Sequence, residues 1–172
     1  IYTPLFFRWR DPVDGERIRA IEIVPHLAIN LTKPVILFPD QTSKNIQFTL
    51  KSLSSEVKGV LHLGLPAGWL VKPERIPFNI KGIGLEKKLE ISITPPASDA
   101  TAQLDIRAEL ENSTVSHGIR NIRYNHIPDQ TLIPRINTRL VRLQLKKRGQ
   151  RIGYIMGSGD DIPKHLQQIG YR

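Results

Sequence analysis

The chain contains no cysteine among its 172 residues, so disulfides, thiolate nucleophiles and cysteine metal ligands are all excluded. Aromatic residues make up only 6% of the chain, with 2 tryptophans and 1 methionine. No apolar run approaches the about 18 residues that a membrane-spanning helix needs, so we expect no membrane span. The lack of cysteine is compatible with a reducing compartment and with a bacterial protein that is periplasmic or secreted, and it leaves the localisation open.

Acidic residues are in the minority, 16 against 25 lysines and arginines, which gives a formal net charge of +9. The positive residues stand mostly singly on alternating segments, as in residues 119–124. The one dense basic run, Lys146 to Arg151, falls where we expect a domain junction. Because basic and stacking residues are not interleaved, the pattern favours solvated basic faces and predicts no nucleic-acid partner.

A strict alternation of apolar and polar residues is the clearest signal in the chain. Ile46, Phe48 and Leu50 point one way and the polar residues between them the other, as a half-buried antiparallel strand requires. After residues 60–63, the segment Leu65-Pro66-Ala67-Gly68-Trp69 forms a corner. We expect Trp69 to fill the core rather than to face solvent, because large aromatic side chains bury the most apolar area in a small sandwich.

Such signals recur at short spacing from residue 20 to residue 145 and predict an all-β fold, an Ig-like antiparallel β-sandwich. The expected strands are 20–24, 27–31, 35–38, 45–53, 58–63, 69–72, 76–80, 87–94, 102–110, 119–125 and 138–145. The expected core residues are Phe48, Leu50, Leu61, Leu63, Trp69, Phe78, Leu89, Ile91, Leu104 and Ile106.

Two shorter regions flank the expected sandwich. Residues 1–19 combine aromatic and charged side chains with Asp-Pro and Asp-Gly turn signals, and we expect an N-terminal arm whose Phe/Trp cluster is buried against the sandwich or a neighbour. Residues 146–172 predict a linker and the truncated start of an α/β domain. In this segment we expect a strand at residues 152–156. We then expect an N-cap at Asp160 or Asp161 and a helix over residues 162–169, ended by Gly170. Because the chain opens with Ile1, we expect an excised piece of a longer protein.

No group of residues predicts catalysis. The five histidines stand at no metal-ligand spacing, no Gly-x-Ser-x-Gly elbow is present, and no cofactor motif occurs. The sequence therefore predicts no catalytic, cofactor-binding or metal-binding residues. The two aromatic residues best placed to be exposed, and so to stack on a sugar ring, are Trp9 and Tyr124.

The order of these segments resembles a known module, the Ig-like α-galactosidase-associated sandwich that accompanies many bacterial glycosidases. The resemblance covers about half of the chain and rests on Phe48, Leu50, residues 59–63, residues 65–73, Phe78 and residues 89–96.

A second resemblance is narrower. Residues 9–16, Arg19 and residues 21–25 are similar to the segment that follows the catalytic domain in large bacterial PIG-L/LmbE-type deacetylases, and residues 151–163 resemble the opening of the amidotransferase-like domain that comes next. The family's Ala-His-Pro-Asp-Asp-Glu zinc motif is absent, so the resemblance carries over no deacetylase residue. It implies a non-catalytic accessory module whose partners are neighbouring domains of the same polypeptide. The alternative is a carbohydrate-binding module.

Overall fold

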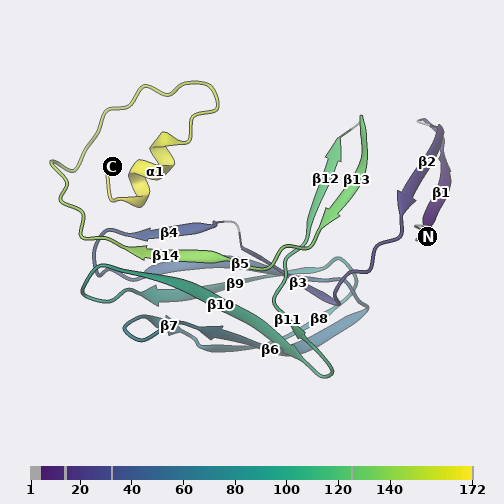
Figure 1. Cartoon of the computed structure of the whole chain (residues 1–172), viewed down its shortest axis with the longest axis horizontal. Helices are drawn as coiled ribbons and strands as arrows, with labels where there is room; N and C mark the ends of the chain where they lie inside the picture. Colours follow the sequence, from purple (N-terminus) through teal and green to yellow (C-terminus); the bar gives the residue numbers. More distant parts are fainter. Residues whose placement is uncertain (1–4, 14, 32, 125, 172) are drawn as a thin grey trace, which may run out of the picture.

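The computed structural model of the chain describes residues 5–171 apart from Asp14, Thr32 and Asn125, and it shows two β-sheets packed face to face (Figure 1). The beginning of the expected arm, residues 1–4, lies outside the described residues. The larger sheet has the order β4 (Val35–Phe38), β14 (Thr138–Arg142), β10 (Ala100–Leu110), β6 (Glu56–Gly64) and β8 (Arg75–Lys81), with β11 (Thr114–Val115) paired to β10. The smaller has the order β3 (Leu27–Leu31), β5 (Lys44–Ser52), β9 (Glu86–Thr94) and β7 (Leu70–Lys72).

The core lies between the two sheets and is built by the alternation seen in the sequence. In β10 every second side chain from Ala102 to Ala108 is buried, while the residues between them face water. The expected core is confirmed, with Leu89 partly rather than fully buried. The fold class, an all-β Ig-like sandwich, follows from these two packed sheets.

The corner before β7 brings Trp69 into this core. Gly68 adopts a φ of 90°, which is open to glycine at little cost, and the Trp69 amide donates to the carbonyl of Pro66 at 3.2 Å. The Trp69 side chain is 6% exposed and meets Phe38 edge to face. The expectation that Trp69 fills the core is therefore confirmed.

One strand pair departs from the expected antiparallel arrangement. β4 runs parallel to β14, with Ile36 opposite Leu140, whereas the other strand pairs of the two sheets are antiparallel. The chain leaves the smaller sheet at the end of β3 and enters the larger at Val35 after Pro34. This short switch between sheets places β4 at the sheet edge beside the last strand.

Two hairpins project from the sandwich (Figure 1). The first, β1 (Phe6–Asp11) and β2 (Gly15–Ala20), occupies the expected arm, and the second is β12 (Arg120–Tyr124) with β13 (Ile127–Leu132). The strand expected at 20–24 was wrong. Strand β2 ends at Ala20, opposite Phe6 at the start of β1. The Ile21 amide still donates to the Leu5 carbonyl at 2.9 Å, but no strand runs beside the chain from there to Pro25, which has no amide to donate.

The C-terminal segment contains one element among its described residues, the helix α1 (Ile162–Gln168). The strand expected at 152–156 was wrong, because no neighbouring strand offers that segment a hydrogen-bonding partner. Asp161 occupies the N-cap position without capping through its side chain, which pairs with Lys164 at 2.6 Å, while Asp160 accepts from the Ile162 amide at 2.9 Å. At its other end the helix stops before Gly170, as expected. Within the described part of the chain α1 is the only helix, and its 7 residues fall far short of a bilayer crossing.

Candidate functional site

The two hairpins lie close enough for strand β2 to contact strand β13, and a pocket of about 330 Å³ opens between them. Opposite residues of an antiparallel pair share a face, so Trp9 with Arg17, and Phe7 with Arg19, project from one face of the first hairpin. The second hairpin contributes Tyr124 and its neighbours from the other side. The pocket is lined by Trp9, Asp11, Arg17, Ile18, Arg19, Arg123, Tyr124, Ile127 and Asp129.

The pocket unites the two residues singled out in the sequence. Trp9 is 38% exposed and Tyr124 is 61% exposed, although they belong to hairpins at distant points of the chain. Trp9 stacks on Phe7 with ring centroids 5.6 Å apart and planes inclined by 25°, and Tyr124 lies 5.8 Å from the ring of His126. Each of the two rings therefore contacts one neighbouring ring and still lies at the surface.

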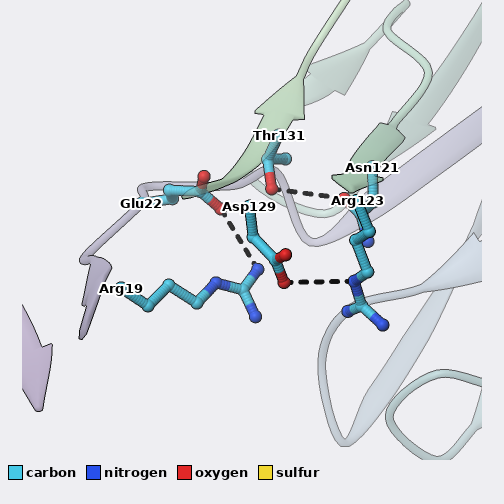
Figure 2. Close-up of polar contacts among 6 residues, drawn as sticks. All are labelled: Arg19, Glu22, Asn121, Arg123, Asp129 and Thr131. Carbon is cyan, nitrogen blue, oxygen red and sulfur yellow. Dashed lines mark hydrogen bonds and ion pairs between the residues drawn. The ribbon is translucent and has the colours of Figure 1, made fainter. Parts of the chain in front are cut away.

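Charged residues surround the aromatic pair, and sequence reasoning missed them. Arg123 Nε lies 3.2 Å from a carboxylate oxygen of Asp129, and Arg19 Nη2 lies 3.4 Å from Glu22 (Figure 2). Thr131 donates to the Asn121 amide oxygen at 3.2 Å across the same hairpin. In the sequence, Arg17 and Arg19 stand two residues apart, as side chains on one face of a strand do. This spacing points to a shared site only when the strand opposite them is known.

The Phe/Trp cluster of the expected arm is not buried against the sandwich. Phe6 and Phe7 are both exposed, so that half of the expectation was wrong, and burial against a neighbour stays a prediction. These side chains stay exposed for two reasons. The register of the first hairpin places aromatic side chains on both of its faces, and the hairpin itself stands away from the core (Figure 1).

The histidines are dispersed over separate elements. His62 Nε2 lies 2.9 Å from Glu109, His26 bonds Ser54 at 2.6 Å, and His165 is on α1. In the region for which side chains are described, no three histidine, aspartate or glutamate side chains converge as metal ligands would. What the hairpin pocket offers is therefore stacking surfaces and hydrogen-bonding groups.

Comparisons with known proteins found solved structures that are similar to this chain only at low identity. No family model and no curated protein matches the chain. The E. coli alpha-2-macroglobulin has a TM-score of 0.45 at 9% identity, and the match covers 75% of this chain and 7% of the macroglobulin. A C. elegans MSP family member, WR4, has a TM-score of 0.38 at 15% identity, with 67% of this chain and 98% of that one covered. The Vibrio cholerae VesB protease has a TM-score of 0.30 at 10% identity, and the match covers 68% of this chain and 31% of the protease.

Proposed function

We propose that this chain is a non-catalytic accessory β-sandwich module of a large bacterial PIG-L/LmbE-type deacetylase, where it fixes the deacetylase domain and an amidotransferase-like domain relative to one another. The observation that carries the proposal is the distribution of exposed apolar side chains. Most of those that the structure describes lie in the two segments that flank the sandwich, residues 5–24 and 143–162, rather than on the sandwich itself.

The first flanking segment exposes apolar side chains on both faces of its hairpin and in the stretch that follows it. Phe6 and Phe7 are 57% and 61% exposed on the first hairpin, and Ile23 is 95% exposed in the unpaired stretch after it. Single exposed apolar residues are common on protein surfaces, but so many of them in one short segment indicate a site of interaction. A neighbouring domain packed here would remove these side chains from water.

The second flanking segment has the same character. Ile155 is 97% and Met156 71% exposed, in a stretch with no strand partner among the described residues. In the longer protein that the resemblance implies, this stretch would open the following α/β domain, whose sheet would supply the strand partner that it lacks here. Pairing with that domain's sheet would satisfy its backbone and bury its side chains at the same time.

The proposal includes a specific expectation about chemistry. The isolated chain should bind no catalytic zinc and should deacetylate no N-acetylated sugar, because no group of histidine and carboxylate side chains suited to a metal ion occurs among the residues that the structure describes. Metal analysis of chelator-free protein and assays on N-acetylated sugars test this expectation. Stoichiometric zinc together with turnover would contradict it.

The packing role is tested by substitution in the full-length polypeptide. Phe6→Ser with Phe7→Ser should weaken the contact with the neighbouring domain, so that the domains unfold at separate temperatures in a calorimeter. Leu70→Ser is the matched control, since Leu70 is 58% exposed on the edge strand β7 and lies outside both flanking segments. Equal effects of the aromatic pair and the control would contradict the proposal.

A second candidate function, a carbohydrate-binding module, is favoured by one observation. Trp9 and Tyr124 line the same pocket.

A further inference from the structure

We propose that the pocket between the hairpins β1–β2 and β12–β13 is a binding site for a neutral saccharide, with Trp9 and Tyr124 as its stacking surfaces. The site deepens the second candidate function and does not depend on the interdomain role. That role rests on Phe6, Phe7 and the C-terminal apolar stretch, which do not line this pocket.

The aromatic pair defines the kind of ligand. Both rings reach water while forming the wall of a concave site, so each leaves apolar surface that a ligand would cover. One face of a pyranose ring carries mainly C–H groups and stacks on such a surface, while its hydroxyls project from the rim. The volume of about 330 Å³ is at the lower end of the range for ligand pockets, about 300–1,000 Å³, and suits a short saccharide.

The charges around the aromatic pair favour a neutral ligand over an anionic one. The carboxylate of Asp129 neutralises Arg123, and that of Glu22 neutralises Arg19. Arg17, the third arginine of the lining, has an interaction partner as well. A polyanion would have to compete with these carboxylates for the same guanidinium groups. The chain's net charge of +9 therefore does not make this pocket a phosphate or nucleic-acid site.

The same ion pairs leave hydrogen-bonding groups for hydroxyls. Arg123 reaches Asp129 through Nε, which leaves its two terminal nitrogens pointing away from that contact. Asp129 has a second carboxylate oxygen that accepts. A guanidinium beside a carboxylate offers donors and acceptors at the spacing of neighbouring sugar hydroxyls, which both donate and accept.

The pocket also joins two elements that are weak alone. A two-stranded hairpin is marginally stable in water, and each wall of the pocket is one such hairpin. A ligand that contacts both walls should clamp them together. Binding should therefore slow amide exchange in β1–β2 and β12–β13 while leaving the sandwich strands unchanged.

The experiment is a glycan array probed with the whole chain, carrying gluco-, galacto-, xylo- and N-acetylglucosamine oligosaccharides, together with acidic glycans and heparin. The neutral oligosaccharide that binds most tightly on the array is then titrated into the chain by calorimetry. Trp9→Ala and Tyr124→Ala should each raise the dissociation constant about tenfold or more. Tyr154→Ala is the matched control, since Tyr154 is a 39% exposed aromatic that does not line the pocket, and it should bind as the unmodified chain does.

Three results would overturn the inference. The first is that the chain binds no neutral oligosaccharide at millimolar concentration. The second is binding that survives both substitutions. The third is binding that is confined to heparin and abolished by salt. Amide exchange on the unmodified chain with the bound oligosaccharide gives a second measurement that needs no variant. Protection of both hairpins supports the site, and protection elsewhere refutes it.

Discussion

Phe38 and Trp69 meet edge to face in the core, with ring centroids 5.4 Å apart and planes inclined by 75°. The contact joins the two sheets, because Phe38 ends β4 of the larger sheet and Trp69 precedes β7 of the smaller. Aromatic pairs in this arrangement contribute about 0.5–1.5 kcal/mol beyond the area they bury. The corner that turns Trp69 inward therefore helps to hold the sandwich closed.

Replacing Trp69 by alanine should destabilise the sandwich by about 3–5 kcal/mol, because the large side chain leaves a cavity between the sheets. Trp9→Ala is the matched control and should change the free energy of unfolding by no more than about 0.5 kcal/mol, since Trp9 lies on a hairpin outside the core. Urea unfolding of both variants measures the difference. Equal losses would contradict the assignment of Trp69 to the core.

Gly59 should not tolerate a side chain. A Cβ at this position in β6 would lie 2.3 Å from the carbonyl oxygen of Glu109 in the neighbouring strand β10, so the two strands would have to move apart. We expect Gly59→Ala to cost about 1–3 kcal/mol of stability.

The control for Gly59 lies in the same strand. A Cβ at Gly64 would meet only the Asp105 side chain, at 3.6 Å, which is ordinary contact. Gly64→Ala should be neutral or slightly stabilising, because alanine loses less backbone entropy than glycine on folding. If thermal unfolding ranks the two variants the other way, the register of β6 against β10 is wrong.

The C-terminal segment should contribute little to the stability of the sandwich. Helix α1 approaches β4, and Lys44 Nζ donates to the Gln168 carbonyl at 2.9 Å, but hollows of about 390 and 990 Å³ remain beside it. Deleting residues 150–172 should leave the unfolding midpoint within a few degrees and improve solubility, since an exposed apolar stretch is removed.

A point substitution tests the docking of the helix. Lys44→Met removes the donor to Gln168, together with the hydrogen bond of the same Nζ to the Leu37 carbonyl of β4 at 2.6 Å. It should speed amide exchange in α1 while moving the unfolding midpoint by no more than a few degrees. A large loss of stability on truncation would show instead that the segment is integral to the domain.

Asp40 should give the sandwich a small stability increment that is lost in acid. Its carboxylate accepts from the Thr42 amide at 2.8 Å, and this hydrogen bond lowers the pKa of Asp40 below 3.8. The folded state therefore releases the Asp40 proton more readily than the unfolded state does. The increment is present above pH 3.8 and disappears as the pH falls through the lowered pKa.

Asp40→Asn should keep the hydrogen bond to Thr42 while removing the titration. The difference in unfolding midpoint between the unmodified chain and this variant should therefore be constant at neutral pH and change only as the pH approaches 3.8 and falls further. A difference that changes between pH 5 and 7 instead would contradict this assignment.

The parts of the fold that the sequence predicted are those where one face of a strand is buried. Leu104 and Ile106 alternate with charged residues in β10, so both the strand and its inward side follow from the pattern. The first hairpin lacks that signal, because Phe6, Phe7 and Trp9 send apolar surface to both of its exposed faces. The sequence showed its turn residues and its exposed Trp9, but not its two strands.

The structures of the apolar stretch 152–156 and of the hairpin pocket depend on the elements that neighbour them in space. The apolar stretch has the composition of a buried strand, but it has no strand to pair with among the described residues. In the pocket, Trp9 and Tyr124 were identifiable one by one as exposed aromatics. Their proximity, and the ion pair of Arg123 with Asp129 beside them, depends on how two separate hairpins stand relative to each other, which no local pattern encodes.

The central claim, that neighbouring domains cover the flanking segments, is tested most directly by amide hydrogen exchange in the full-length polypeptide and in this chain alone. We predict that residues 5–24 and 143–162 exchange rapidly in the isolated chain and become strongly protected in the longer one. Strand β7, with its exposed Leu70, should exchange alike in both. Equal exchange of the flanking segments in the two proteins would contradict the account.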